Sequence, residues 1–283
     1  MRNRTVFGIA FLLAFTAQGQ TPAPRIAQGG VVSAGLSSPV LRQFASNSIV
    51  SIFGENFAPP GTARLVGAAD LIDGKLPENL GGVCIEIGGQ RARIFHLFSG
   101  QLNIQVPALA ATGPMPVQVI LNCGSANETK SNAEMAPAQA AAPEFFYFVR
   151  NSNGRNPIAA IDPLTGGLIG LEGLIPGPAF TPAQPRQIVS LFATGLGRTD
   201  PSFAPGALPD RIASTVEKVV VTFDSFMGTM FPDVLYAGVA PGLAGVYQIN
   251  VRVPDSAPDF DLLVRIRVGN FTSPPGAYLT VRR

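Results

Sequence analysis

The chain has 283 residues, with 20 Lys and Arg against 18 Asp and Glu. Removal of Arg2 and Arg4 with an N-terminal leader would leave 18 residues of each sign, so the mature protein has no surplus of positive charge. This balance argues against a nucleic-acid binder, which needs a clustered basic surplus. It also argues against a basic amphipathic helix that lies on a membrane surface.

The composition predicts an all-β protein. The chain contains 31 Gly and 26 Pro but no Trp, and these turn residues separate short runs rich in Val, Ile and Phe. Such a pattern is typical of many short strands joined by loops. Proline removes a backbone donor, so its even spread also leaves little room for helices.

The first 19 residues have the layout of a secretory signal peptide. Two arginines precede an apolar stretch over residues 6–17, and Ala17 and Gly19 offer a cleavage point. The stretch is shorter than the roughly 20 apolar residues that span a bilayer. A buried N-terminal strand or an uncleaved anchor is the alternative. We expect an exported protein that is secreted, periplasmic or at the cell surface, with no integral membrane span after cleavage.

In the first half of the chain, strands are expected at residues 48–53, 83–87, 91–97, 101–106 and 115–121. Within 101–106 the apolar residues alternate with Asn103 and Gln105, a period of two that turns one side to a core and the other to water. Gly88 and Gly89 predict a tight hairpin, because glycine accepts the positive φ of such turns. Sheets of this kind bury their apolar side against a second sheet, which predicts a β-sandwich.

The chain has two cysteines, Cys84 and Cys123, both in the first half. An even count in an exported chain favours a disulfide over free thiols. Sequence does not establish the close Cα approach that a bridge needs, so free thiols remain the alternative. A bridge would reinforce the first half only.

The second half repeats this plan. Residues 136–143, rich in Ala and Pro, are expected to be the last connection of the first half or a short linker. Beyond them, strands are expected at 187–193, 218–223, 233–236, 247–253, 261–268 and 277–281.

Two segments of the first half return in the second. SIVSIFGENFA at 48–58 returns as QIVSLFATGLG at 187–197, and QLNIQVP at 101–107 returns as QINVRVP at 248–254. The order is kept at a separation of about 140 to 147 residues, which indicates a duplicated domain rather than a short solenoid repeat. We expect two tandem β-sandwich domains, over residues 28–142 and 143–283.

Several motifs follow one another along nearly the whole mature chain: GVVSAG at 30–35, SIVSIFGENFA, LPENLGGVCIEIGG at 76–89, QLNIQVP, LIGLEGLIPG at 168–177, ATGLG at 193–197 and YAGVAPGLAGVYQINVRVP at 236–254. In this order they resemble the Solibacter-type family of uncharacterised secreted bacterial domains. Such domains are similar to the IPT/TIG branch of immunoglobulin-like (E-set) folds, so the resemblance implies immunoglobulin-like sandwiches. It implies no reaction and no binding residues. Ser33, where the family has Asn, and the two cysteines depart from its pattern.

His96 is the only histidine. This excludes a multi-histidine metal site and leaves one candidate general base of that type. Its aromatic neighbours in the sequence favour a structural role. No GxSxG elbow surrounds a serine, and an enzyme would need a pocket in which His96 meets two acidic residues. We therefore expect no enzyme, and no catalytic, cofactor-binding or metal-binding residues.

Two kinds of loop allow other interpretations. Gly195 and Gly197 suggest a phosphate loop, but no third glycine and no helix follow, so a strand-to-loop turn is favoured. Aspartates in two further loops could offer oxygens to Ca²⁺, but neither loop has EF-hand spacing, so solvated loops are favoured. These aspartates are Asp70, Asp73, Asp255, Asp259 and Asp261.

Arg252, Arg265 and Arg267 lie in predicted strands. If these strands are neighbours, the three side chains share one sheet face and could form a basic strip for an acidic glycan or a carboxylate. The alternative is a solvent face balanced by nearby aspartates. Exposed aromatic residues bind sugars or proteins, although packing in cores or between the domains is favoured for the candidates Phe95, Phe98, Phe145, Phe146, Tyr147 and Phe148.

These features predict a non-enzymatic exported protein that works as a binding, adhesion or spacer module for an unknown protein or glycan of the cell envelope. Rigid sandwiches would present loop tips or an exposed sheet edge for recognition. The alternative is a carbohydrate-binding accessory module, which predicts a line of exposed aromatic residues on one sheet face.

Overall fold

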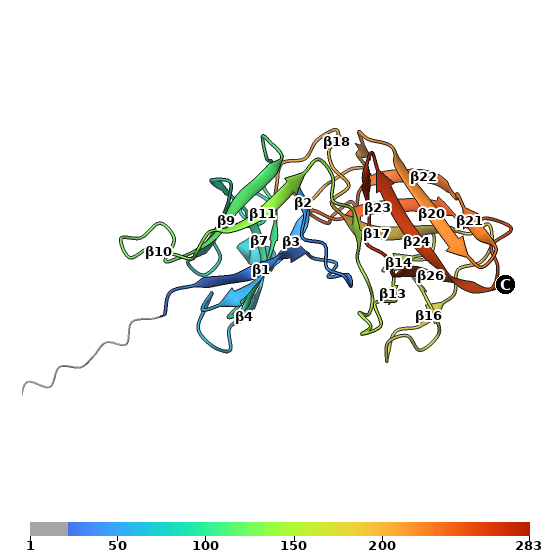
Figure 1. Ribbon diagram of the computed structural model, residues 1–283, viewed down its shortest axis with the longest axis horizontal. Coiled ribbons are helices and arrows are strands. Elements are labelled where there is room, and N and C mark those ends of the chain that lie inside the picture. Colours follow the sequence, from blue (N-terminus) through green and yellow to red (C-terminus); the bar gives the residue numbers. More distant parts are fainter. Residues whose placement is uncertain (1–21) are drawn as a thin grey trace, which may run out of the picture.

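The computed structural model describes residues 22–283, so the predicted signal peptide lies outside the described residues. The described part consists of strands, turns and one short 3-10 helix, η1 (Ala68–Asp70) (Figure 1). The predicted all-β, immunoglobulin-like sandwich architecture is confirmed. Within residues 22–283, no helix has the length and apolar character needed to cross a membrane.

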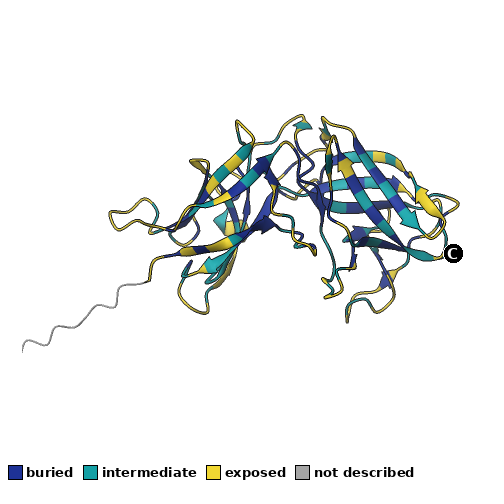
Figure 2. Ribbon diagram, viewed as in Figure 1, coloured by how far each residue is buried: buried dark blue, intermediate teal, exposed yellow. Residues whose placement is uncertain are grey.

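The N-terminal unit, residues 22–139, contains two sheets. The five-stranded sheet has the order β1 (Arg25–Ser33), β3 (Ile49–Glu55), β8 (Gln101–Gln105), β7 (Arg93–Phe98) and β4 (Ala63–Leu65). The six-stranded sheet has the order β2 (Phe44–Ala45), β11 (Glu134–Gln139), β9 (Gly113–Leu121), β5 (Val83–Ile87) and β6 (Gln90–Arg91), with β10 (Thr129–Lys130) on β9. Apolar residues between the sheets form one buried cluster, as the alternating burial along the strands requires (Figure 2).

The C-terminal unit, residues 140–283, has its own buried cluster. Its nine-stranded sheet has the order β16 (Phe180–Thr181), β15 (Leu168–Ile169), β14 (Ala160–Ile161), β17 (Ile188–Thr194), β23 (Tyr247–Arg252), β22 (Asp233–Val239), β19 (Ser214–Thr215) and β18 (Thr199–Asp200), with β12 (Glu144–Phe145) on β17. Its six-stranded sheet has the order β13 (Asn156–Pro157), β26 (Ala277–Val281), β24 (Phe260–Val268), β20 (Val219–Ser225) and β21 (Gly228–Met230), with β25 (Phe271–Thr272) on β24. The domain boundaries at 28–142 and 143–283 remain predictions.

Each strand predicted from the sequence is present, with its ends shifted by a few residues. The glycine hairpin is confirmed, since Gly88 and Gly89 have φ of 57° and 80° and join β5 to β6. The interpretation of residues 136–143 as a connection or linker was wrong for their first part, because β11 pairs with both β9 and β2. Pro137 there lies opposite Pro114, so the ladder tolerates both prolines at positions that need no N–H donor.

The two units share the same side-chain hydrogen bonds at equivalent positions. In the N-terminal unit, the side-chain oxygen of Asn103 accepts hydrogen bonds from Ser51 Oγ at 3.0 Å and from Gln101 Nε2 at 2.9 Å. In the C-terminal unit, the oxygen of Asn250 accepts from Ser190 Oγ at 2.8 Å and from Gln248 Nε2 at 2.8 Å. The repeated sequence segments therefore adopt the same register and the same side-chain contacts, which favours the duplication hypothesis.

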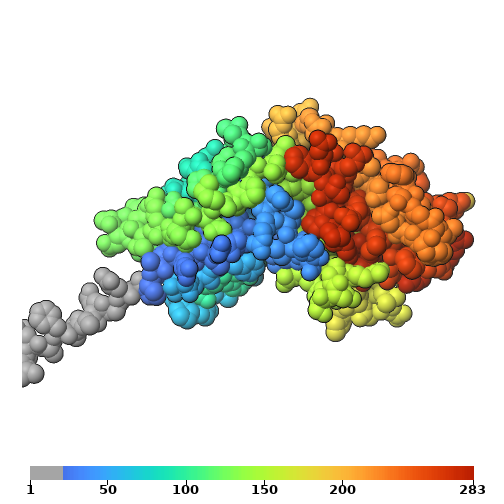
Figure 3. Space-filling model, viewed as in Figure 1, coloured from blue at the N-terminus to red at the C-terminus, as the bar shows by residue number. Residues whose placement is uncertain are grey.

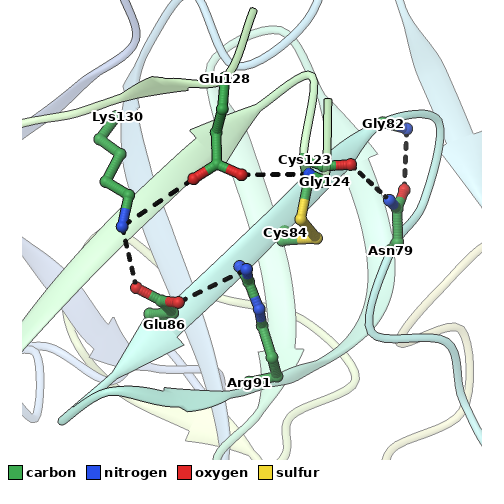
Figure 4. The surroundings of a disulfide bond; sticks show 9 residues. All are labelled: Asn79, Gly82, Cys84, Glu86, Arg91, Cys123, Gly124, Glu128 and Lys130. Atoms are coloured by element: carbon green, nitrogen blue, oxygen red, sulfur yellow. Dashed lines mark hydrogen bonds and ion pairs between the residues drawn. A yellow bond between two sulfur atoms is a disulfide. The ribbon is translucent and has the colours of Figure 1, made fainter. Parts of the chain in front are cut away.

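The predicted disulfide between Cys84 and Cys123 is present, with a Cα–Cα distance of 5.9 Å. It joins β5 to the end of β9 on the side of the sheet that faces away from the core (Figure 4). Beside it, Glu86 lies 3.5 Å from Arg91 and 3.6 Å from Lys130. The bridge closes a segment of 39 residues, which restricts the unfolded N-terminal unit.

The two units touch along a seam (Figure 3). The buried carboxylate of Glu144, in the C-terminal unit, accepts hydrogen bonds from the backbone N–H of Gly35 and of Ser37, each at 2.9 Å. Thr194 Oγ accepts a further bond from Ile49 N–H at 2.9 Å. Gly35 has no room for a side chain, because a Cβ would lie 2.6 Å from the Glu144 carboxyl carbon. The seam is thus held by buried, charge-assisted hydrogen bonds.

The disulfide gives a first stability prediction. Replacing both cysteines (Cys84→Ser with Cys123→Ser) should lower the unfolding free energy of the N-terminal unit by about 4 kcal/mol, because a loop of this length is no longer closed in the unfolded chain. Urea unfolding followed separately in each unit measures the change. An equal loss in the C-terminal unit, or no loss in either, would contradict this assignment.

The seam gives a second prediction. Glu144→Ala should cost about 3 kcal/mol of unfolding free energy, since two buried N–H groups lose their acceptor. It should also speed hydrogen exchange at Gly35 and Ser37. Glu55→Ala, at a carboxylate that is 61 % exposed, is the control and should change stability little. Unchanged exchange in the Glu144 variant would show that this carboxylate does not hold the seam.

Candidate functional site

Strands β3, β8 and β7 place every second side chain on the outer side of the five-stranded sheet. The alternate residues Val50, Ile52, Leu102, Ile104 and Ile94 are fully buried in the core. The outward residues form three rows across the strands, in the order β3, β8, β7: Ile49–Gln105–Arg93, Ser51–Asn103–His96 and, one position beyond the pair Leu97–Leu102, Phe53–Gln101–Phe98. We call the six residues of the second and third rows the outer face.

The C-terminal unit covers the first of these rows. The backbone N–H of Gly206 donates to Gln105 Oε1 at 2.6 Å, and Gln105 is only 3 % exposed. A Cβ on Gly206 would lie 2.9 Å from Arg93 Cδ, and one on Gly245 would lie 2.7 Å from Ile49 Cγ1. Two glycines therefore allow the C-terminal unit to lie directly on the sheet. The cover ends at this row, and five of the six outer-face residues are partly exposed.

The second row holds its polar groups in fixed positions. Asn103 uses its oxygen for Ser51 and Gln101, and its amide nitrogen lies 3.4 Å from His96 Nδ1. Partial burial lowers the pKa of His96, so the ring is neutral at pH 7. Because Nδ1 accepts from the amide, the proton of the neutral ring belongs on Nε2. In the described part of the chain, His96 Nε2 and Gln101 Oε1 have no hydrogen-bond partner.

The third row places two aromatic rings on either side of an amide. Phe53 and Phe98 belong to strands on opposite sides of β8, so they are separated by two strand spacings, roughly 10 Å. The Phe98 ring meets His96 edge-on, with ring centres 6.1 Å apart. Beyond Phe53, a hollow of about 480 Å³ extends over Gly54 and Gly100.

The equivalent face of the C-terminal unit is built differently. Its rows are Ser190–Asn250–Tyr236 and Phe192–Gln248–Gly238. Glycine thus stands where the N-terminal unit has Phe98. The Tyr236 ring occupies that space, since a Cβ on Gly238 would lie 2.5 Å from the tyrosine oxygen, and its hydroxyl donates to Val239 O at 2.8 Å. Only the N-terminal unit therefore pairs two aromatic rings across an amide.

A groove of about 370 Å³ lies where the units meet near the edge of the five-stranded sheet. A β-bulge between Ile94 and His96 directs Phe95 into it. The groove is apolar, and its largest lining side chains are Val66, Leu71, Leu76, Phe95, Leu208 and Leu243. Leu65 and Ile72, both about 60 % exposed, extend apolar surface beside it.

The predicted arginine strip is not formed. Arg252 lies on β23 of the nine-stranded sheet, whereas Arg265 and Arg267 lie on β24 of the six-stranded sheet. The prediction required neighbouring strands, but β23 and β24 lie in different sheets of the C-terminal unit. Arg265 instead donates to the carbonyl of Ser273 at 3.1 Å.

Aspartates of the acidic loops form ion pairs with arginines. Asp255 pairs with Arg186 at 2.6 Å, and this hydrogen bond lowers the pKa of Asp255. Within residues 22–283, no group of three or more His, Cys, Asp or Glu is arranged to hold a metal ion. The remaining pairs are Asp70–Arg64, Asp259–Arg283 and Asp261–Arg282.

The glycine turn and His96 are the two other sequence candidates. Gly195 and Gly197, with φ of 74° and 87°, turn the chain after β17, and Gly197 O accepts from the Tyr247 hydroxyl. His96 contacts Asn103 and Phe98, and neither is one of the two acidic residues that a catalytic pocket around this histidine would need.

The outer face was not identified from the sequence as a site. Alternation placed Asn103 on the water side, and Phe98 was one of several candidate aromatics. Ser51, Phe53 and Gln101 were not singled out. The available signal was the repeat itself, because QLN and QIN keep the same amide residues at outward positions of both units.

No family model and no curated protein matches the chain. Membership of the Solibacter-type family therefore remains a prediction. Among solved structures, the chain is similar to the plexin A4 extracellular region, at 10 % identity and a TM-score of 0.30 over 100 % of this chain and 20 % of that one. It is also similar to two surface glycan-binding proteins. The Bacteroides ovatus protein has 11 % identity and a TM-score of 0.32 over 85 % of this chain and 44 % of that one. The Prevotella bryantii protein has 9 % identity and a TM-score of 0.25 over 90 % of this chain and 41 % of that one. The chain thus spans less than half of each of these proteins, and a likeness of this size says nothing about a ligand.

The sole histidine gives a direct test of the site's protonation. The imidazole signals of His96 should titrate in NMR with a midpoint below the ordinary value of 6.5, because partial burial disfavours the charged ring. Because the unfolded chain takes up the proton first, the contribution of His96 to the unfolding free energy should be constant above pH 6.5 and fall as the pH drops through the lower folded value. A midpoint at or above 6.5 would contradict the partly buried environment.

Proposed function

We propose that this protein is a non-enzymatic binding protein of the cell envelope, exported from the cytoplasm, that contacts its partner through the outer face of the N-terminal unit. One observation carries the proposal: the C-terminal unit covers a single row of this sheet and leaves five of the six residues of the other two rows partly exposed, with their polar atoms already held in place.

The seam supports this function because it fixes the face relative to the rest of the protein. Glu144 and Thr194 hold the seam on one unit, and Gln105 holds it on the other. A surface whose side chains are ordered before binding loses less conformational entropy when a partner arrives. The sequence suggested recognition by loop tips or a sheet edge, whereas the geometry favours a sheet face.

The apolar groove favours a second candidate function, docking of a protein partner at the seam. The observation behind it is the bulge that turns Phe95 toward Leu208 and Leu243 of the other unit. Exposed apolar surface of this kind is typical of protein-binding sites. In that function the outer face would be a solvated surface without a role in binding.

Variants of the two sites separate these functions. Binding of the mature chain to an envelope fraction should weaken about tenfold or more in Gln101→Ala and in Phe98→Ala, the loss typical of a central contact residue. Gln248→Ala, at the equivalent position of the C-terminal unit, is the matched control and should bind like the unchanged protein. Surface plasmon resonance with immobilised protein provides the measurement.

The groove variant Leu243→Asp decides between the candidates. The proposal predicts that it binds the envelope fraction normally. Loss of binding in Leu243→Asp together with normal binding in Gln101→Ala would assign the function to the groove instead. An envelope fraction that fails to bind the unchanged protein would refute both.

A further inference from the structure

We infer that the outer face binds a neutral polysaccharide. This inference rests on the proposed function and names the ligand class of the same site. Three features of the face carry it: its free hydrogen-bonding atoms, its pair of aromatic rings and its lack of charge.

The free atoms of the face match a sugar hydroxyl. A hydroxyl both donates and accepts hydrogen bonds. Gln101 Nε2 donates to Asn103 Oδ1 at 2.9 Å, which leaves Gln101 Oε1 as a free acceptor. It also uses His96 Nδ1, at 3.4 Å, and leaves the Nε2 proton as a free donor. One acceptor and one donor are thus held on neighbouring rows by bonds that already exist in the unbound protein.

The aromatic rings suit the apolar side of a sugar ring. The face of a phenyl ring carries negative charge density, which attracts the weakly positive C–H groups of a pyranose. Phe53 and Phe98 stand roughly 10 Å apart with Gln101 between them. A single sugar cannot contact both rings at that separation, so the arrangement selects a chain of linked sugars.

The charge of the face selects a neutral chain. None of its six residues is acidic or a permanent cation, and the charged residues at its borders are paired within the protein. Arg93 lies 2.8 Å from Glu78, and Arg25 lies 3.7 Å from Glu55. Recognition of a carboxylate or sulfate would require a free guanidinium or ammonium group. The outer face offers none, so an acidic polysaccharide would lose hydration without gaining an ion pair.

The C-terminal unit supplies an internal comparison. It keeps the amide and hydroxyl groups of the network in Ser190, Asn250 and Gln248. Its second aromatic position is Gly238, and Tyr236 is tied to backbone oxygen there. The network alone is therefore common to both units, and the open aromatic pair distinguishes the proposed site.

Affinity electrophoresis of the mature full-length chain tests the inference. Native gels would contain a neutral polysaccharide (galactomannan, xyloglucan, a β-glucan or dextran) or an acidic one (alginate or polygalacturonate). We expect at least one neutral polymer to retard the protein, and Phe98→Ala and Gln101→Ala to weaken that retardation tenfold or more. Gln248→Ala should migrate with the unchanged protein. Thermal unfolding of each variant confirms that it is folded, and Phe98→Tyr, which keeps the ring, should retain binding.

Each other outcome overturns the inference in an identifiable way. Retardation by acidic polymers alone would refute the neutral ligand. Retardation that survives in both face variants would place the glycan elsewhere on the protein. No retardation by any neutral polymer, with binding to the envelope fraction still lost in Gln101→Ala, would leave the proposed function standing with a protein ligand and would refute the glycan. If the face variants lost neither retardation by polysaccharide nor binding to the envelope fraction, the proposed function would be refuted as well.

Discussion

The contact between Gly206 and Gln105 is the constraint on which the site depends. Gln105 would otherwise extend the line of partly exposed amides, Gln101 and Asn103, along strand β8. The Gly206 backbone reaches its side-chain oxygen at 2.6 Å, and no residue with a side chain could come so close without moving Arg93. This contact buries Gln105 and defines where the accessible surface begins. The Glu144 carboxylate holds the same two units together at another point of the seam.

The two units have similar sheets, but only the N-terminal unit carries the proposed binding face. Both keep the serine, asparagine and glutamine that order the sheet surface. They differ on one strand, β7 in the N-terminal unit and β22 in the C-terminal unit, where Phe98 corresponds to Gly238 and His96 corresponds to Tyr236. The Tyr236 ring packs over Gly238, whereas Phe98 and His96 are partly exposed. Two similar sheets thus keep the same internal hydrogen bonds and differ in surface chemistry through the side chains of one strand.

The sequence predicted the parts of this structure that depend on local pattern. Alternation located the strands, glycine φ preferences located the 88–89 hairpin, and the even cysteine count pointed to the bridge between Cys84 and Cys123. It failed where pairing between distant segments decides. Strand β11 contains a proline that pairs with a second proline of β9, and the arginine strip required β23 and β24 to be neighbours. The outer face was hidden for the same reason, since Phe53, Gln101 and Phe98 become one row only after three strands are paired.

The most direct measurement follows the side-chain amide signals of nitrogen-15-labelled protein while a soluble envelope polysaccharide is added. We expect the side-chain amide signals of Gln101 and Asn103 to shift together with the imidazole signals of His96, while those of Gln248 and Asn250 remain unchanged. Shifts confined to the C-terminal unit, or to residues around Leu243 in the groove, would contradict this expectation.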